Sequence, residues 1–397
     1  MTREEERNAR QGDARQGEMR QEDARQGEAL RENARQGDTP RGEAHQQDTH
    51  QGEARQEKTA RHRQRVRRRC ALVVAIFSAL LLLSFVVSMS TGYTGLSPLD
   101  IARILTGSGT PQEELILFEF RLPRIVISVL VGMGLALAGC IIQSVTRNAL
   151  ADPGLLGINA GAGIMVILFT LFIGRMSFYS VFLLPFLALC GASLTAVLIY
   201  ALAYRRSDGV APLRLILVGI AVQAGIAAAT LLLVVKLDDT QLANFATWQA
   251  GSIWGSNWQY VLALLPWFAL LVPLVLTKSR VLDVLLLGNE TAISLGVPLG
   301  REQVKLLAIA VALAASSVAV SGSIGFVGLI APHLARRLVG SRHHILLPVC
   351  ALTGAVLVSV ADTIARSIVQ PAEIPVGIIV AVIGAPYFLY LLAKSKF

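Results

Sequence analysis

The stretch from Arg121 to Gly163, RLPRIVISVLVGMGLALAGCIIQSVTRNALADPGLLGINAGAG, decides the fold class. Between Arg124 and Arg147 it holds 22 consecutive residues without a charged side chain. A helix of about 20 residues crosses the hydrocarbon core of a bilayer, which is about 30 Å thick. A turn signal, DPG at 152–154, precedes the next apolar run. The stretch therefore predicts one transmembrane helix, a short loop and the start of another.

Apolar windows of similar length recur along the rest of the chain. Together they predict ten spans, at 70–90, 122–145, 158–174, 181–203, 213–236, 258–277, 303–320, 326–340, 345–365 and 375–393. The 397 residues are 53% hydrophobic and 16% charged, with a mean hydropathy of +0.56, whereas about a quarter of the residues of soluble proteins are charged. This composition excludes a uniform soluble enzyme, a collagen-like chain and a disulfide scaffold. We expect residues 70–397 to form an all-α, polytopic membrane domain with ten transmembrane helices.

Residues 1–69 differ sharply in composition, with 17 basic and 14 acidic side chains. From Ala9 they repeat in five-residue units such as ARQGD and ARQGE. A five-residue step advances about 500° around a helix, so the repeat forms no apolar stripe. We expect a disordered cytoplasmic tail that cannot bury a core. The cluster RHRQRVRRR at 61–69 is interpreted as a topology anchor before the first span, and we expect no nucleic-acid partner.

The basic side chains of the loops predict the orientation in the membrane. With ten helices and a cytoplasmic N-terminus, thirteen basic side chains after residue 69 lie on the inner side and six on the outer side. The six arginines at 61–69 add to the inner side. Cytoplasmic loops of membrane proteins carry such an excess of Lys and Arg. We therefore expect a multi-pass protein of the cytoplasmic membrane with both termini in the cytoplasm.

Motifs for chemistry are missing from this sequence. It contains no GxxxxGK[ST] phosphate loop, and its four cysteines lie in apolar segments without a CxxC pair. His333 has no acidic or cysteine neighbour, and the histidines at 343–344 belong to a predicted basic loop. We expect no catalytic residue, no metal site and no cofactor bound by this chain. Asp362 and Arg366 are spaced for an i, i+4 pair. With its one clear membrane acid paired, the sequence has too few acidic side chains within the spans for a proton relay. This favours transport that is powered from outside the chain.

Five stretches carry a family resemblance in a fixed order. They are the opening stretch at 121–163, WQAGSIWGSNWQ at 248–259, LDVLLLGNETAISLGVPLG at 282–300, VSGSIGFVGLIAPHLARRLVG at 320–340 and QPAEIPVGIIVAVIGAPYFLYLL at 370–392. Together they resemble the permease subunits of ATP-binding cassette importers for iron-siderophore, haem and cobalamin. The resemblance runs from about residue 90 to the C-terminus. Ala149 stands where the family usually has proline, and the tail has no counterpart in the family.

The resemblance implies a set of partners and a cargo. A second permease subunit, identical or different, would complete the path, and two ATP-binding subunits would hold ATP and Mg on the inside. An extracytoplasmic substrate-binding protein would deliver the cargo, which we expect to be an iron-siderophore complex. A haem or cobalamin permease of the same architecture is one alternative. An ion-gradient-driven secondary transporter is the other.

The stretch at 282–300 resembles the family's coupling helix and is called the coupling segment below. Asn289 is a candidate N-cap, Glu290 complements the positive end of a short helix, and Gly296 followed by Pro298 ends that helix in under two turns. Its apolar side chains would be exposed without a partner, although folding back on the bundle is an alternative. The residues expected to contact the ATP-binding subunit are Gly288, Asn289, Glu290, Leu295 and Gly296.

Two more groups complete the candidate sites. Arg121, Arg124 and Arg366 lie at predicted outer helix ends, and the resemblance implies that they pair with acidic residues of the binding protein. Snorkelling of the same arginines to the membrane interface is the alternative. By resemblance, Asn148 and Leu150 line an inner gate together with the loop at 205–213, although an ordinary turn fits equally well. Glu373, before a helix start, receives no chemical role.

Overall fold

The computed structural model describes residues 22, 24–32, 64, 68–91, 97–172, 180–205, 209–210, 212–253, 255–369 and 372–394. The chain divides into two compact units, Met1–Arg68 and Arg69–Phe397. In the first unit, residues 24–32 are helical with mostly exposed side chains. Most of the tail at 1–69, whose disorder stays a prediction, lies outside the described residues.

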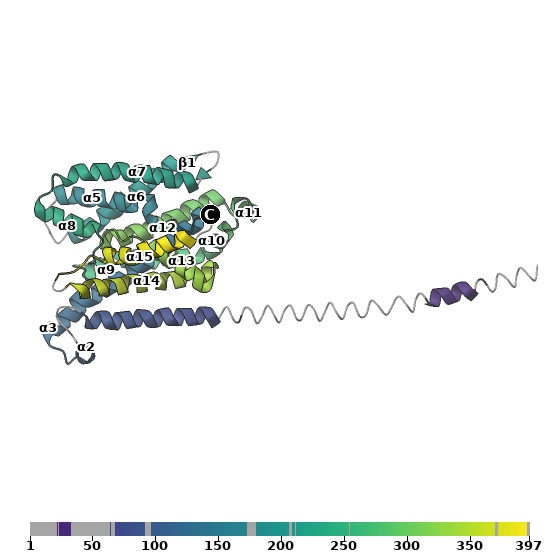
Figure 1. Ribbon diagram of the computed structural model, residues 1–397, viewed down its shortest axis with the longest axis horizontal. Coiled ribbons are helices and arrows are strands. Elements are labelled where there is room, and N and C mark those ends of the chain that lie inside the picture. Colours follow the sequence, from purple (N-terminus) through teal and green to yellow (C-terminus); the bar gives the residue numbers. More distant parts are fainter. Residues whose placement is uncertain are drawn as a thin grey trace, which may run out of the picture. The chain divides into compact units, whose positions relative to one another are not determined.

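The described part of the second unit is helical apart from one small hairpin. Helix Arg68–Ser90 begins at the boundary between the units. The elements that follow are α2 (Pro98–Leu105), α3 (Pro111–Glu114), η1 (Leu115–Arg121), α4 (Leu122–Thr146), η2 (Pro153–Leu156), α5 (Ile158–Phe172), α6 (Ser180–Ala203), β1 (Tyr204–Arg205), β2 (Gly209–Val210), α7 (Pro212–Val234), α8 (Asp239–Gln249), α9 (Trp258–Thr277), α10 (Ser279–Leu285), α11 (Asn289–Ser294), α12 (Leu299–Ser321), α13 (Val327–Val339), α14 (His343–Ile368) and α15 (Val376–Lys394). Figure 1 shows the long helices packed side by side.

The predicted spans appear as eight full-length helices and two shorter ones. Among the described residues, eight helices are long and apolar enough to cross a membrane. The predicted spans at 158–174 and 326–340 correspond to α5 and α13, which have 15 and 13 residues. The second span is longer than expected, because the π-helical turn η1 joins α3 to α4 in one helix, Pro111–Thr146. The all-α membrane fold is confirmed.

Helix α4 forms the centre of the bundle because its glycines admit neighbouring backbones. A Cβ atom added at Gly139 would lie 1.9 Å from the carbonyl oxygen of Gly328 in α13. One added at Gly132 would lie 2.3 Å from the carbonyl oxygen of Gly354 in α14. In lipid, helices associate through close packing of small residues rather than through the hydrophobic effect. Close approach at these glycines therefore fixes α4 against α13 and α14.

The helices α5, α6, α7 and α8 form a group along one side of the bundle in Figure 1. Within the part of the chain that the structure describes, helix α7 has an exposed apolar face formed by Leu213, Leu217, Ile220, Leu231 and Leu232. Between α6 and α7, Tyr204 pairs with Val210 and Arg205 with Gly209 in the antiparallel hairpin β1–β2. This hairpin occupies the loop that was predicted to border the inner gate, although residues 206–208 and 211 lie outside the described residues.

Candidate functional site

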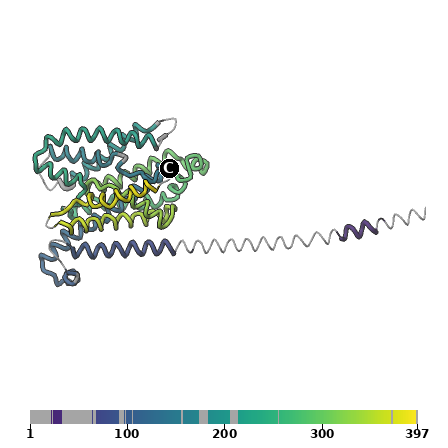
Figure 2. The backbone as a smooth tube through the Cα atoms, in the orientation of Figure 1, coloured from purple at the N-terminus to yellow at the C-terminus, as the bar shows by residue number. Residues whose placement is uncertain are grey.

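The coupling segment forms α10, α11 and their connections at one end of the bundle, opposite to α2 and α3, as the backbone trace in Figure 2 also shows. The N-cap of α11 is Gly288, so the prediction of Asn289 as the cap is wrong by one residue. Gly288 has φ 106° and ψ 160°, a conformation that side chains other than glycine rarely adopt. The chain therefore enters this helix through glycine geometry rather than through a side-chain cap.

The end of α11 follows the predicted pattern. The N–H of Gly296 donates to the carbonyl of Ile293 at 2.9 Å, and that of Val297 donates to Ala292 at 3.0 Å. With φ 80° at Gly296, this arrangement is a Schellman motif. The helix has six residues, so the prediction of fewer than two turns is confirmed.

Helix α11 and its flanks divide into a buried face and an exposed face. Leu282, Leu285 and Ala292 are buried against the bundle. Three apolar side chains point outward, with Leu287 62%, Ile293 60% and Leu295 60% exposed. We call these three residues the coupling patch. Clustered exposed apolar side chains of this kind mark interaction surfaces.

Polar contacts of the segment, and of the residues just before and after it, hold it to the bundle. Arg147 Nη2, after the end of α4, donates to Asn289 Oδ1 at 3.0 Å. Lys278, between α9 and α10, donates to Glu302 Oε2 of α12 at 2.7 Å. Lys305 holds the other oxygen of the same carboxylate at 2.9 Å. The coupling patch is therefore presented on a segment that is tied to α4 and α12.

The predicted gate residues Asn148 and Leu150 lie in the turn that follows Arg147. Asn148 Oδ1 accepts a hydrogen bond from the backbone N–H of Leu150 at 2.9 Å, and both residues are half-buried. Arg147 itself is left-handed, with φ 51°. Asp152 Oδ1 accepts from the N–H of Gly154 at 2.8 Å; burial raises the pKa of this carboxyl, and that hydrogen bond opposes the rise. The turn is ordered and lies beside the coupling segment.

At the opposite end, Arg124 is buried between two acids. Its Nε donates to Asp362 Oδ1 at 2.9 Å, and its Nη1 donates to Glu373 Oε2 at 2.8 Å. Sequence reasoning gave Glu373 no chemical role, whereas the structure makes it an ion-pair partner across 249 positions. The expected i, i+4 pair is also present, with Arg366 Nε 3.4 Å from Asp362 Oδ2.

The other two candidate docking arginines reach back to helix Arg68–Ser90 and its end. Arg366 Nη2 donates to the carbonyl of Ser88 at 3.2 Å, and Arg121 donates to the carbonyl of Met89. The exposed fractions of Arg121, Arg124 and Arg366 are only 6%, 9% and 6%. We call these arginines, with Asp362 and Glu373, the outer cluster. The structure brings the three arginines together inside the chain, where they join three helices and the residues before α15, and their docking to a binding protein stays a prediction.

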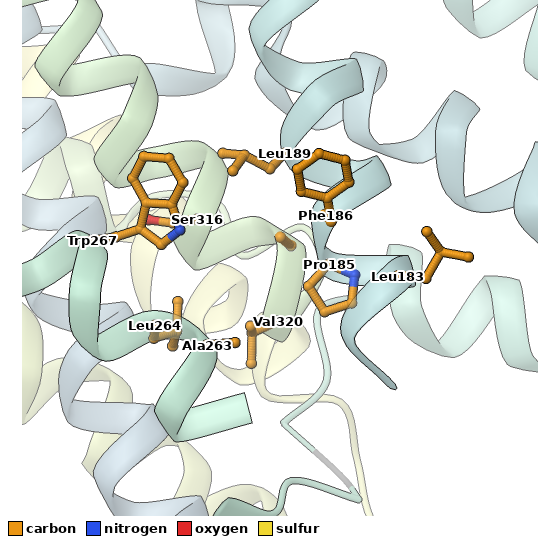
Figure 3. Close-up of a pocket in the computed structure, with 10 residues that line it drawn as sticks. Leu183, Pro185, Phe186, Leu189, Ala263, Leu264, Trp267, Ser316 and Val320 are labelled. Carbon is orange, nitrogen blue, oxygen red and sulfur yellow. The ribbon is translucent and has the colours of Figure 1, made fainter. Parts of the chain in front are cut away.

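Two cavities of different polarity lie between the helices. One, of about 520 Å³, is bounded by α6, α9 and α12, and Figure 3 shows Phe186 and Trp267 at its walls. Ser316 is the one hydroxyl on an otherwise almost wholly apolar lining, which suits hydrocarbon rather than a charged chelate. The second cavity, also of about 520 Å³, lies between α5, α7 and α8 and includes amide and hydroxyl groups from Asn159, Gln223, Thr230, Gln249 and Ser323.

The structure also shows an unexpected buried histidine. His343 lies not in the predicted basic loop but at the first position of α14, and it is completely buried. It contacts Asp283 of α10 and Ser144 of α4. These partners lie 60 and 199 positions away, so no local sequence pattern could have indicated them. Among the described residues, no group of three or more His, Cys, Asp or Glu side chains could hold a metal ion.

Comparison with known families assigns this architecture. The description "FecCD transport family" belongs to a family model that matches residues 80–394. The chain belongs to the FecCD transport family. Among FecCD relatives, the iron(3+)-hydroxamate import system permease protein FhuG of Bacillus subtilis (strain 168) is 48% identical over 329 residues, which cover 82% of this chain and 97% of FhuG. The iron-uptake system permease protein FeuC of the same organism is 43% identical, covering 81% of this chain and 97% of FeuC.

A solved structure supports the FecCD assignment. A metal-chelate type ABC transporter in an inward-facing conformation superimposes with a TM-score of 0.72 at 33% sequence identity, covering 82% of this chain and all of that chain. The resemblance seen in the sequence is thus confirmed, and with it a multi-pass transport permease.

Proposed function

We propose that this chain is the permease subunit of an ATP-binding cassette importer that carries an iron-siderophore complex across the cytoplasmic membrane. The observation that carries the proposal is the coupling patch, which a short helix presents at one end of a membrane bundle. Among the described residues, nothing covers Leu287, Ile293 and Leu295, and a partner surface would remove them from water. Membership of the FecCD family and the iron-chelate names of the relatives support the choice of cargo.

The partner at the coupling patch is an ATP-binding subunit, two of which serve the importer. ATP and Mg bind to those subunits, so this chain transports and does not hydrolyse. A second permease subunit, identical or different, covers the apolar face of α7 and completes the path. With the coupling segment on the cytoplasmic side, both termini are cytoplasmic, in agreement with the distribution of basic loop residues.

Movement of the coupling segment reaches the inner gate through a short physical connection. The Arg147–Asn289 hydrogen bond joins the first residue of α11 to the turn that holds Asn148 and Leu150. ATP binding that displaces α11 pulls on this turn, while the Lys278–Glu302 pair transmits the same motion to α12. The inner gate therefore opens and closes with the state of the ATP-binding subunits.

The outer cluster is proposed as the docking region for the binding protein. Its three arginines and two acids carry a net charge of +1, and the Glu373 side chain is 29% exposed beside Arg124. An acidic side chain of the binding protein that replaced Glu373 at Arg124 would preserve the ion pair. Docking would then loosen the start of α15 and open the outer side of the path.

The energy source for uptake distinguishes the proposed importer from a secondary transporter. Cells that express the complete importer are given a ⁵⁵Fe-hydroxamate complex and are either depleted of ATP or treated with an ionophore. We expect ATP depletion to stop uptake and the ionophore to leave it largely intact. The reverse pattern would support ion-gradient coupling. Uptake of labelled haem or cobalamin, without uptake of the ⁵⁵Fe-hydroxamate complex, would instead favour one of the other cargoes.

The contact with the ATP-binding subunit has its own test. Leu295→Asp places a charge in the coupling patch and is expected to prevent co-purification of the ATP-binding subunit. Leu99→Asp is the matched control, because Leu99 is also exposed but lies on α2 at the other end of the bundle. Normal co-purification of the Leu295→Asp protein would place the contact elsewhere.

A further inference from the structure

A chain of polar side chains, two of them completely buried, connects three elements that meet beside the coupling segment. His343 Nδ1 lies 2.7 Å from Asp283 Oδ1, and His343 Nε2 lies 2.7 Å from Ser144 Oγ. Asp283 belongs to α10, His343 begins α14, and Ser144 lies in the last turn of α4. These contacts link the coupling segment to the helices α4 and α14.

Asp283 also completes the start of α14. The N-cap of α14 is Arg342, whose side chain makes no capping hydrogen bond. Asp283 Oδ1 instead accepts the backbone N–H of His343 at 2.8 Å. The first N–H groups of a helix lack partners within the helix and carry positive partial charge. A carboxylate from α10 thus supplies the cap that α14 does not provide for itself.

The single hydroxyl hydrogen of Ser144 limits the directions that the hydrogen bonds between these side chains can take. Ser144 Oγ lies 2.7 Å from the carbonyl of Cys140 as well as 2.7 Å from His343 Nε2, but a hydroxyl has one hydrogen to donate. If both ring nitrogens of His343 are protonated, Nδ1–H donates to Asp283, Nε2–H donates to Ser144, and Ser144 donates to Cys140. These three contacts are then all hydrogen bonds, and an imidazolium is paired with a carboxylate.

A Ser-His-Asp order invites comparison with a hydrolase triad, and burial excludes that interpretation. The side chains of Ser144 and His343 are completely buried. A nucleophile needs space for a reacting carbonyl and donors for the oxyanion that forms. Ser144 lies inside the packed turn of α4, so no substrate reaches its oxygen. The group is a mechanical connection rather than a catalyst.

We propose that His343 is a positioning residue for transport, which holds the coupling segment to α4 and α14 so that ATP-driven displacement of the segment moves both helices. The inference rests on the proposed function and adds a second connection to the Arg147–Asn289 bond. Both connections end on α4, at Ser144 and at Arg147, within its last turn and cap. Displacement of α10 and α11 is therefore delivered to one end of the central helix.

The test measures how many chelate molecules are imported per ATP hydrolysed, in proteoliposomes that contain the complete importer. His343→Ala removes both contacts, His343→Asn keeps a donor near Asp283, and His343→Gln keeps reach toward Ser144. We expect each variant to lower the ratio about fivefold or more, while ATP hydrolysis continues. His344→Ala is the matched control, because His344 is the next residue of α14 and is exposed. Its ratio is expected to equal that of the wild type.

The possible results distinguish a failure of the positioning role of His343 from a failure of the proposed transport function. An unchanged ratio in folded His343→Ala protein, or an equal fall in His344→Ala, would overturn the positioning role. If His343→Ala fails to fold, the milder Asp283→Asn and Ser144→Ala variants decide by the same ratio. A wild-type importer that moves no iron chelate would overturn the proposed function and this inference together. Normal wild-type import with normal ratios in the variants would overturn this inference alone.

Discussion

Arg147 Nη2 donates to Asn289 Oδ1 at 3.0 Å, across 142 positions of sequence. The donor follows the last residue of α4, and the acceptor is the first residue of α11. One bond thereby joins the turn of the predicted inner gate to the segment that carries the coupling patch. We expect the geometry of the coupling segment to determine how ATP hydrolysis is coupled to uptake, and the following substitutions test this expectation.

Backbone geometry at the two ends of α11 is expected to be essential for coupling. Gly288→Ala and Gly296→Ala force alanine to adopt φ 106° and φ 80°, which costs about 1–3 kcal/mol at each site. The coupling patch is then displaced, and uptake is expected to fall several-fold while ATP hydrolysis by the assembled importer persists. Gly300→Ala is the control, because its added Cβ meets no atom within 4 Å and its φ is not positive. Equal uptake by all three variants would contradict the assignment.

Charge at the start of α11 provides a second test. Glu290 is exposed in the first turn, where a negative charge stabilises a helix by about 0.3–1 kcal/mol. Glu290→Lys is expected to leave the bundle folded but to weaken binding of the ATP-binding subunit. Asp239→Lys makes the same change in the first turn of the exposed helix α8. If both variants weaken binding to the same extent, the effect is not specific to the coupling segment.

Arg124 is expected to support folding as well as docking. Arg124→Gln leaves the buried Asp362 without its closest partner, and breaking a buried ion pair costs about 3–5 kcal/mol. The melting temperature in detergent should therefore fall clearly. Arg103→Gln breaks an exposed pair with Glu113, for which about 0–1 kcal/mol is typical, and should leave the melting temperature nearly unchanged. Equal melting temperatures of the Arg124→Gln protein and the wild type would show that the outer cluster is not structural.

Close packing of α4 is expected to tolerate no added methyl group. Gly139→Ala places its Cβ 1.9 Å from the backbone of α13, so the helices must separate. We expect a loss of folded protein, measured by size-exclusion chromatography with fluorescence detection. Gly225→Ala in α7 is the control, since its added Cβ meets no atom within 4 Å. A normal elution profile for Gly139→Ala would show that α4 and α13 are less tightly packed.

Removal of residues 1–58 is expected to leave transport intact. The deletion spares the arginines at 61–69, which are interpreted as a topology anchor, and removes the whole self-neutralising repeat. Uptake by the shortened protein should match that of the full chain at equal membrane levels. Loss of uptake despite normal insertion would assign the tail a role in transport.

Local sequence features predicted much of this fold. The spans follow from runs of apolar residues, and the end of α11 follows from Gly296, because both depend on neighbouring positions. The Asp362–Arg366 pair was also predictable, since its members are one helical turn apart. The cap of α11 was placed one residue late, because glycine geometry at Gly288 leaves no side-chain signature.

Contacts between distant segments were not predictable from a single sequence. Arg124 and Glu373 are 249 positions apart, so nothing near Arg124 in the sequence indicated this ion pair. His343 looked like one of two histidines in a basic loop until folding placed Asp283 and Ser144 around it. Burial of these charged groups thus depends on the tertiary packing of helices that are far apart in the sequence.

The most direct test of the proposed function is accumulation of ⁵⁵Fe-hydroxamate in proteoliposomes that contain this chain, its ATP-binding subunits, any second permease subunit and the binding protein. The account predicts accumulation above the external concentration when ATP faces the coupling segment, and none when ATP is omitted. The Leu295→Asp importer should give no accumulation even with ATP. Accumulation that needs only an ion gradient and this chain, without ATP or the ATP-binding subunits, would contradict the account.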